Sequence, residues 1–216
     1  MIADRRGFIL ANTRLQTSPF TPEIRLHLAT EITPIWKLTE EGLESLGLPP
    51  PFWAFAWAGG QALARYLLDN PGTATGKRVL DFAAGGGIVA VAAMKAGAAS
   101  ALAADIDAFS ETAIALNAEA NGVEIGYTGI DLLDAAPPDV DLIVAGDIAY
   151  EKPVAVRVRA WLAAAAATGT TVLIGDPWRS YFDPAGLTQL SEYDVPTTRE
   201  LEDKEIKRAG VWRFER

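Results

Sequence analysis

The sequence has no cysteine and a single histidine, His27, among its 216 residues. Without cysteine the chain cannot form disulfides, thiolate metal sites, iron–sulfur clusters or a cysteine nucleophile. A histidine-based metal centre needs more than one such ligand, and a Ser-His-Asp triad would depend on His27, which has no nucleophile motif near it. The sequence therefore predicts no metal site and gives no support to a serine hydrolase.

Long hydrophobic runs are also absent, although half of the residues are hydrophobic. The Ala-rich run that starts at Trp161 ends at Thr168-Gly169, short of the roughly 18 residues that a membrane span needs. The first six residues lack the apolar segment of a secretory signal, so we expect a cytoplasmic protein without a membrane partner. Length and apolar content predict one folded domain with at most a small extension, and they exclude disorder.

Basic residues are scarce in the middle of the chain. Between Asp81 and Glu151 there are twelve Asp and Glu residues but one base, Lys95. Binding a phosphate backbone requires clustered Lys and Arg, so nucleic acid is disfavoured as a partner. An acidic surface attracts a cationic ligand or a lysine-bearing protein, although an acidic balance can also serve solubility alone.

From residue 77 onward, short apolar runs alternate with helical stretches. Strands are predicted at 77–82, 100–105, 123–127, 141–146 and 170–175, with helices at 87–96, 109–121 and 153–167. This alternation predicts a parallel sheet with helices on both faces. The strands show little apolar–polar alternation, which is typical of strands covered on both sides.

The C-terminal part of the sequence has a different pattern. Residues 187–202 and 209–215 resemble two strands joined by the charged segment 203–208. Since no helix fits between them, we expect an antiparallel hairpin at one edge of the sheet.

Residues 1–50 are predicted to be a small N-terminal extension. It contains strand-like residues at 23–28 and a short helical stretch at 39–46. Three consecutive prolines separate it from the main domain, 51–216, which opens with a predicted helix at 58–68.

A glycine-rich turn follows the first predicted strand and leads directly into a helix. The segment Asp81-Phe82-Ala83-Ala84-Gly85-Gly86-Gly87 lets a ligand approach the backbone where doubly wound sheets bind nucleotides. Gly85-x-Gly87-x-x-Ala90 also satisfies a dinucleotide-binding pattern, which leaves a nicotinamide-dependent reductase as an alternative. Against that alternative, no Tyr-x-x-x-Lys pair follows Tyr127, Tyr150 or Tyr181.

Three acids at predicted strand ends favour a different ligand. Asp81 is placed to accept hydrogen bonds from a cationic amino group, and it would repel a pyrophosphate. Asp105 closes the next strand, where it can bind both ribose hydroxyls of an adenosine, and Asp131 can accept from the adenine amino group. Together they suit S-adenosylmethionine, which has a sulfonium, an amino group and an adenosine but no phosphate. The structural alternative is that each acid caps a helix.

The segment Asp81-x-Ala83-x-Gly85-x-Gly87, with Asp105 and the C-terminal hairpin, resembles the seven-β-strand S-adenosylmethionine-dependent methyltransferases. Ala83 departs from the usual glycine, but it is small enough to leave the turn intact. The resemblance implies a Rossmann-like, doubly wound, seven-stranded α/β sheet, mostly parallel with a C-terminal antiparallel hairpin. It also implies S-adenosyl-L-methionine as the cofactor, with these five residues in its site.

The fourth predicted strand ends in Asp147-Ile-Ala-Tyr150. Methyltransferases that act on nucleobases or glutamine carry Asn-Pro-Pro-Tyr here, which holds a planar, neutral nitrogen. An ionised Asp147 suits a cationic amine: it can bind the lysine ammonium, help its proton leave and direct the lone pair at the methyl group. Tyr150 would form an aromatic wall beside the lysine. We therefore predict Asp147 and Tyr150 as the catalytic residues.

The Asp-x-x-Tyr motif, together with residues 51–64 and the segment Gly175-Asp176-Pro177-x-Arg179, resembles the protein-lysine branch of these methyltransferases. The most similar group that we recognise is the electron transfer flavoprotein β-subunit lysine methyltransferases, and the resemblance extends from about Thr33 to Pro184. It implies a protein substrate with an accessible lysine, with the electron transfer flavoprotein β subunit as first candidate.

The same resemblance implies roles for three further residues. Trp57 would line the cofactor pocket, and Asp131 and Leu132 would contact the adenine. Core packing is the alternative role of the aromatic residues at 52–57, and we expect it for at least two of them.

Other functions remain open at this stage. The same fold could methylate a ribosomal protein or a small amine, and it could be a binding module without catalysis, although such a module would normally have lost the acids. The first 30 residues and the segment 203–208 either contact a protein substrate or are solvated surface.

Overall fold

The computed structural model describes residues 4–29, 50–198, 202 and 204–215. Their main feature is a seven-stranded sheet with the strand order β5-β4-β3-β6-β7-β9-β8. The strands from β5 to β7 in this order are parallel, and β9 pairs antiparallel with both β7 and β8. The bounds are β3 Arg78–Phe82, β4 Ser100–Ala104, β5 Gly126–Thr128, β6 Leu142–Gly146, β7 Thr171–Asp176, β8 Leu187–Pro196 and β9 Ile206–Phe214. The predicted fold class is confirmed.

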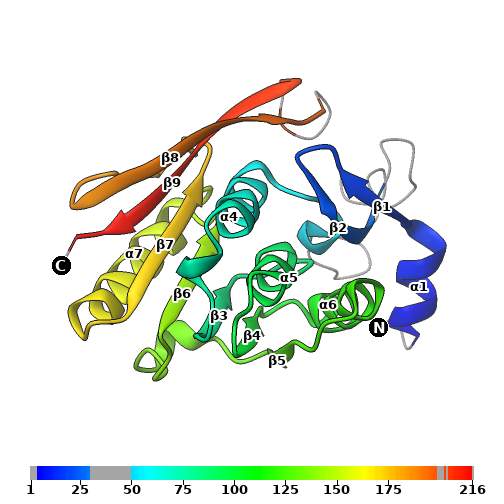
Figure 1. Ribbon diagram of the computed structural model, residues 1–216, viewed down its shortest axis with the longest axis horizontal. Coiled ribbons are helices and arrows are strands. Elements are labelled where there is room, and N and C mark those ends of the chain that lie inside the picture. Colours follow the sequence, from blue (N-terminus) through cyan, green and yellow to red (C-terminus); the bar gives the residue numbers. More distant parts are fainter. Residues whose placement is uncertain (1–3, 30–49, 199–201, 203, 216) are drawn as a thin grey trace.

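Helices cover both faces of this sheet (Figure 1). On one face lie α4 (Ala58–Asp69) and α5 (Ile88–Lys95), with α6 (Ala108–Asn121) beside α5, and on the opposite face lies α7 (Lys152–Ala167). Asp107 caps the start of α6 by accepting a hydrogen bond from the Phe109 N–H, and Gly122 ends that helix in a left-handed conformation.

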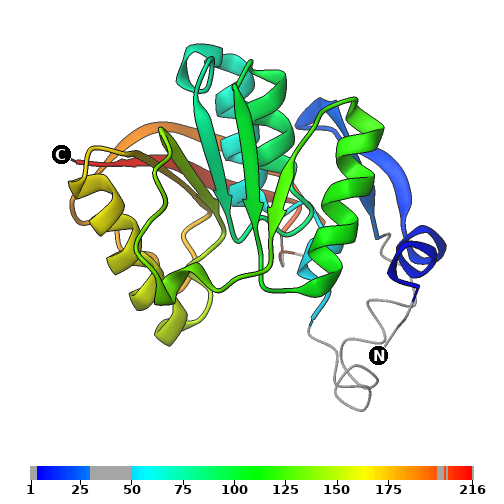
Figure 2. The same cartoon turned by 90° about the horizontal axis from the view of Figure 1, so that it is seen from below.

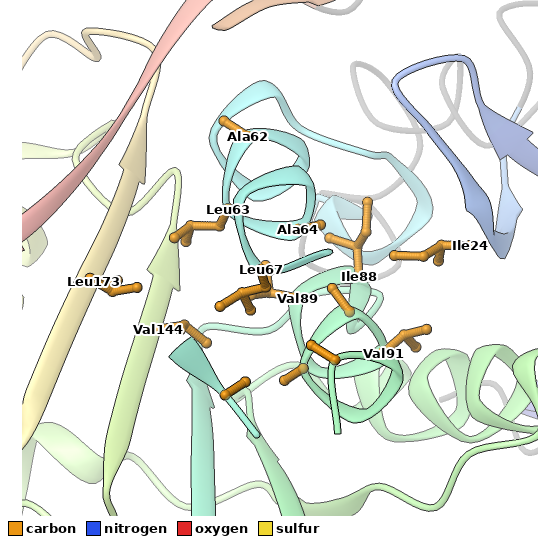
Figure 3. Close-up of a cluster of buried hydrophobic side chains, with 14 of the residues drawn as sticks. Ile24, Ala62, Leu63, Ala64, Leu67, Ile88, Val89, Val91, Val144 and Leu173 are labelled. Atoms are coloured by element: carbon orange, nitrogen blue, oxygen red, sulfur yellow. The ribbon is translucent and has the colours of Figure 1, made fainter. Parts of the chain in front are cut away.

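The core lies between these layers because successive strand residues point to opposite faces. Val144 of β6 and Leu173 of β7 pack with α4, whereas Ile143 of β6 packs with α7. Figure 3 shows Leu63 and Leu67 of α4 extending toward Val144 and Leu173. Strands buried on both faces explain why their sequences lack alternation.

The described N-terminal residues form α1 (Arg5–Asn12) and an antiparallel hairpin of β1 (Arg14–Ser18) and β2 (Thr21–Leu28), which lies beside α6 (Figure 2). Ile24 of β2 is completely buried and joins the core formed by α4 and α5 (Figure 3). The predicted strand at 23–28 is confirmed, but α1 and β1 are not predicted. The helix expected at 39–46 lies outside the described residues.

Element boundaries differ from the prediction mainly in the third strand and the C-terminal hairpin. β5 begins at Gly126 rather than at Val123, and β8 ends at Pro196 rather than at residue 202. β9 begins at Ile206, within the predicted charged connection, because Lys207 and Arg208 pair with Val195 and Asp194 of β8. Short 3₁₀ turns complete the described chain: η1 Phe52–Ala54, η2 Pro71–Thr73 and η3 Leu132–Asp134.

The strand order reverses between β3 and β6, since the chain builds outward from β3 through β4 to β5 and then returns to place β6 on its other side. At such a reversal the connections leave in opposite directions and open a crevice at the carboxyl ends of the strands. Among the described helices, none combines the length and apolarity that crossing a membrane requires.

Candidate active site

A cavity of about 590 Å³ lies at the carboxyl ends of β3, β4 and β6, where the strand order reverses. This volume is within the range of small-molecule sites. The cavity brings together every residue predicted for the site except Gly87: Trp57, Asp81, Ala83, Gly85, Asp105, Asp131, Leu132, Asp147 and Tyr150. Gly87 instead forms the N-cap of α5 with a φ of 78°.

The glycine-rich turn after β3 has a demanding backbone. Ala83 and Gly85 have φ values of 56° and 53°, in the left-handed region that glycine tolerates best. A Cβ on Gly86 would lie 2.7 Å from the Trp53 carbonyl oxygen, so glycine is required there. Ala83 therefore adopts a backbone conformation that favours glycine.

Asp105 holds this turn in place. Its Oδ2 accepts a hydrogen bond from the Gly85 N–H at 2.7 Å, and its Oδ1 accepts one from the Asp107 N–H at 2.9 Å. Because Asp107 is the residue that caps α6, the capping alternative does not apply to Asp105. Each carboxylate oxygen accepts a single N–H here and has a second lone pair for a ligand.

Asp81 is buried beneath the turn, with 1% of its surface exposed. Its Oδ2 accepts a hydrogen bond from the Ala90 N–H in the first turn of α5, so part of its role is the structural one. Burial raises the pKa of the Asp81 carboxyl to about 7. A cation placed next to this carboxyl would favour its ionised form.

Asp131 is the N-cap of η3, since its Oδ1 accepts a hydrogen bond from the Leu133 N–H at 3.0 Å. The alternative that this acid caps a helix therefore holds for Asp131. Arg157, which also lines the cavity, lies 4.0 Å from Asp131 and pairs more closely with Asp134 at 2.8 Å.

Asp147 follows β6 with a φ of 56° and is almost completely buried. Its Oδ2 accepts a hydrogen bond from the Gly60 N–H at 2.8 Å. Its Oδ1 accepts two from Arg179, one from Nε at 3.1 Å and one from Nη2 at 2.7 Å. Burial raises the pKa of the Asp147 carboxyl, while the Arg179 charge opposes that rise. Half-exposed Tyr150 lies close to Phe52, with 5.4 Å between the ring centres.

The Asp147–Gly60 contact depends on a close approach of α4 to the sheet. A Cβ on Gly59 would lie 2.2 Å from the Gly175 carbonyl oxygen, and a Cβ on Gly146 would lie 2.9 Å from Gly60. Without side chains at these positions, the N-terminus of α4 reaches the ends of β6 and β7 directly.

The four aromatic residues before α4 all line the cavity, and one of them, Trp53, is also part of the buried core. Trp53 is buried and stacks on Phe109, with ring centres 5.7 Å apart, and half-buried Phe55 packs against the same cluster. Trp57 lines the cavity, donates its indole N–H to the Phe52 carbonyl and lies 5.5 Å from the Arg179 guanidinium. Trp53 therefore packs in the core as expected, whereas Phe55 is only partly buried against that cluster, and both also line the cavity.

Two cavity residues on α6 were not predicted. Asn117 donates to the Gly86 carbonyl oxygen and accepts from the His27 N–H, so it joins the glycine-rich turn to β2. The Ser110 hydroxyl is buried in the cavity lining without a hydrogen-bond partner, which makes it available to a ligand. Neither stands out in the sequence, because polar residues on a helix are ordinarily solvent-exposed.

Asp176, at the end of β7, is completely buried. Its Oδ1 accepts a hydrogen bond from the Arg179 N–H at 2.7 Å, whereas its Oδ2 has no partner. Burial raises the pKa of this carboxyl to about 7. Within the described ranges, no group of three or more His, Asp or Glu residues is arranged to hold a metal ion.

Known proteins show what this chain is similar to. A family model described as ribosomal protein L11 methyltransferase (PrmA) matches residues 61–171. The electron transfer flavoprotein β subunit lysine methyltransferase of Rattus norvegicus is 38% identical over 216 residues, which cover 97% of this chain and 84% of that protein. The Homo sapiens protein of the same name is 37% identical over 217 residues, with coverages of 97% and 82%.

This chain belongs to the electron transfer flavoprotein β subunit lysine methyltransferase family. The family resemblance predicted from the sequence is thereby confirmed. The nicotinamide-dependent reductase, which rested on Gly85-x-Gly87-x-x-Ala90 alone, loses its support. Among solved structures, a ribosomal protein L11 methylase from Lactobacillus delbrueckii subsp. bulgaricus matches with a TM-score of 0.55 and 22% identity, covering 75% of this chain and 81% of that one. That likeness shows a shared fold.

The cavity of this lysine methyltransferase family member fits S-adenosylmethionine. Two carboxyl groups, on Asp81 and Asp105, face a ligand that carries positive charge, and the unpartnered Ser110 hydroxyl adds a hydrogen-bonding group. Apolar side chains such as Phe82 and Leu132 supply surface for an adenine ring.

Proposed function

We propose that this protein transfers a methyl group from S-adenosylmethionine to lysine side chains of a protein, and that its substrate is the electron transfer flavoprotein β subunit. The observation that carries the proposal is one cavity shared by Asp81 and Asp105 on one side and by Asp147 and Tyr150 on the other. The relatives that match over almost the whole chain are named for this reaction and this substrate.

The cofactor-binding residues would act as follows. Asp105 would accept hydrogen bonds from the ribose hydroxyls while it holds the Gly85 N–H. Asp81 would face the amino group, and Asp131 and Leu132 the adenine. Trp57, Ala83, Gly85 and Gly87 would shape the pocket and the turn. When bound, S-adenosylmethionine supplies an activated methyl group on its sulfonium.

Asp147 and Tyr150 would receive the lysine. Asp147 would bind the lysine ammonium and, once the lysine has lost its proton, would orient the neutral amine. Orienting the amine is the main requirement of an in-line transfer from an activated methyl donor. Tyr150, with its ring beside Phe52, would enclose the apolar stem of the lysine. The acidic cavity and the shortage of bases between residues 81 and 151 favour a lysine-bearing protein over nucleic acid.

The test is methyl transfer by Asp147→Asn. We expect kcat to fall by about 100-fold or more, because a group that positions and assists the reacting amine is lost. The Kd for S-adenosylhomocysteine should change by less than about threefold, since Asp147 is not assigned to the cofactor. Radiolabelled methyl transfer to purified electron transfer flavoprotein β subunit measures the first quantity, and calorimetry measures the second.

Asp139→Asn is the matched control, because the Asp139 side chain is 94% exposed and pairs with Arg78 on the surface. Label in lysine of the β subunit that depends on Asp147 supports the proposal. Label confined to small molecules or nucleic acid contradicts it. Because the family model that matches residues 61–171 is that of a ribosomal protein methyltransferase, ribosomal proteins are the second acceptor to assay.

A further inference from the structure

A buried charge cluster lies beside the cavity and contains residues to which the proposed function gives no role. Arg179, shortly after β7, donates from Nη1 to Glu202 Oε2 at 2.8 Å and from Nη2 to Glu202 Oε1 at 2.6 Å. The Glu202 side chain is 1% exposed, and the Lys207 ammonium of β9 lies 3.5 Å from it. Glu202 comes from the connection between β8 and β9, and β9 pairs with β7, the strand that precedes Arg179.

The same guanidinium also holds Asp147. Its Nε and Nη2 donate to Asp147 Oδ1 at 3.1 and 2.7 Å, so Arg179 bridges two buried carboxylates. A guanidinium presents its donors in a rigid planar fork, which lets Arg179 make a bidentate contact with Glu202 and direct two donors to one oxygen of Asp147. The Trp57 ring lies against the guanidinium on the cavity side.

The N-terminus of α4 completes the arrangement. This helix has no capping side chain of its own, and its first-turn N–H groups point to the same two carboxylates. The Ala58 N–H donates to Glu202 Oε1 at 3.4 Å, and the Gly60 N–H donates to Asp147 Oδ2 at 2.8 Å. The positive end of the helix and Arg179 therefore compensate both buried charges.

The backbone on both sides of the contact is strained. Asp147 and Trp178 have φ values of 56° and 61°, and Ala83 is the only other described residue besides glycine with a positive φ. Such conformations persist only where the surrounding contacts enforce them, and they gather at functional sites. Here two strained turns, after β6 and after β7, bring Asp147 and Arg179 together.

We propose that Arg179 is a positioning residue for methyl transfer: clamped by Glu202 of the β8–β9 connection, it fixes the Asp147 carboxylate in the orientation that receives the substrate amine. The proposal rests on the proposed function, because it deepens the role of Asp147. According to the proposal, the orientation of the Asp147 carboxylate depends on Glu202 of the C-terminal hairpin, a residue outside the cavity.

A purely structural cluster would lower activity only through loss of folded protein and would leave kcat of the folded fraction unchanged. The titration of Asp147 tests a separate point, the electrostatic link from Arg179 and Glu202 to this carboxyl. The charged groups that face Asp147 are Arg179, Glu202, the N-terminus of α4, and Asp176 at the end of β7. The charge of Asp147 raises the pKa of Asp176. Lys207 contacts Glu202 and so affects Asp147 through Glu202. The Arg179 charge lowers the pKa of Asp147, and the Glu202 charge raises it. Removing each partner should therefore shift that pKa in opposite directions.

The experiment compares Arg179→Gln, Arg179→Lys and Glu202→Gln with the wild type. Carboxyl ¹³C NMR follows the pKa of Asp147 without any acceptor protein, and Asp147→Asn assigns the resonance. We expect a higher pKa in Arg179→Gln, by about one unit or more, and a lower one in Glu202→Gln. Asp176→Asn removes the neighbouring titration, so a signal that vanishes in that variant belongs to Asp176 and overturns the assignment.

Kinetics supplies the second readout. For methylation of the electron transfer flavoprotein β subunit, kcat should fall by about tenfold or more in Arg179→Gln with little change in KM, and Arg179→Lys should recover part of it. The acid limb of the pH profile should move to higher pH in Arg179→Gln and to lower pH in Glu202→Gln. Arg78→Gln, which removes a surface arginine paired with Asp139 and Asp141, is the control and should change neither quantity.

The two proposals fail in different ways. If the NMR shifts have opposite signs but the wild type methylates no protein, the proposed function is wrong while the link from Arg179 and Glu202 to Asp147 stands. If the wild type is active and kcat, pKa and pH profile are the same in all three variants, Arg179 is no positioning residue. Should Arg179→Gln not fold, the lower pKa and the shifted acid limb expected for Glu202→Gln, together with kcat of Arg179→Lys, still decide.

Discussion

At the residue scale, Asp105 shows how one carboxylate serves both the fold and a ligand. It accepts the Gly85 N–H with one oxygen and the Asp107 N–H with the other, which fixes the turn beside the cavity. Hydrogen bonds to a charged group contribute about 1.5–3 kcal/mol each, so the turn and a ribose both gain from the same negative charge. Removing that charge should therefore weaken both ligand binding and the fold of this turn.

Asp105→Ala should raise the Kd for S-adenosylhomocysteine by at least about tenfold, because two charge-assisted hydrogen bonds to the ribose would be lost. Isothermal titration calorimetry measures the Kd, and urea unfolding checks that the variant is folded. Asp139→Ala, at a carboxylate that is 94% exposed and pairs with Arg78 on the surface, is the control. An unchanged Kd in Asp105→Ala would remove Asp105 from the cofactor site.

Residue-level patterns predicted the acids of the cavity but not the groups that hold them. Asp81 lies in the last two residues of β3, and Asp105 and Asp147 directly follow β4 and β6. Parallel strands bring their carboxyl ends to one edge of the sheet, so the order of the strands along the chain is enough to predict that these three acids lie close together. The sequence predicts Arg179 only as part of a motif, and Glu202 only as the last residue of the predicted strand 187–202. Their contact depends on β9 lying between β7 and β8, which no local pattern encodes.

At the element scale, the site depends on how closely α4 approaches the sheet. Gly59 and Gly175 face one another across this contact: a Cβ on Gly175 would lie 2.1 Å from the Gly59 carbonyl oxygen. Backbone on both sides leaves no flexible side chain that could move aside. A methyl group there must push α4 away from β7 and withdraw the Gly60 N–H from Asp147.

Gly175→Ala should therefore lower the free energy of unfolding by about 3 kcal/mol or more, at the upper end of what overpacking costs. Gly72→Ala is the matched control, because a Cβ on Gly72 meets nothing within 4 Å and its φ is not positive. Its effect should stay within about 0.5 kcal/mol. Urea unfolding followed by circular dichroism compares the two. Equal stabilities would mean that α4 is free to shift.

The elements themselves were predictable where periodicity is strong. β6 and β7 are continuous apolar runs, and α6 lies between an Asp N-cap and a Gly C-cap. α1 and β1 escaped prediction because they are short and polar, with one buried residue in each. The start of β9 was misplaced for a related reason: Lys207 and Arg208 are charged, yet an edge hairpin tolerates charge on its exposed side.

At the scale of the whole molecule, the chain folds with two buried carboxyls whose ionisation is costly. Burial raises the pKa of Asp81 and of Asp176 to about 7, from an ordinary value of 3.8. Both are neutral in the folded protein at pH 5, whereas in the unfolded chain they are ionised. The surface carboxyls Asp139 and Asp141 shift in the opposite direction, because hydrogen bonds from Arg78 lower their pKa values and favour their ionised forms.

The stability of the whole protein should therefore fall with rising pH between about 4 and 7 through Asp81 and Asp176. The folded state binds more protons than the unfolded state in this window, so each group lowers the free energy of unfolding by up to about 1.4 kcal/mol per pH unit. Asp176→Asn removes one group while its Oδ1 still accepts the Arg179 N–H. In urea unfolding from pH 4.5 to 7.5, the free energy of unfolding of this variant should rise relative to the wild type as pH rises. The difference between Asp139→Asn and the wild type should stay nearly constant, because the pKa of Asp139 is lowered from 3.8 and lies below this range. A constant difference between Asp176→Asn and the wild type would mean that Asp176 keeps its ordinary pKa in the folded protein.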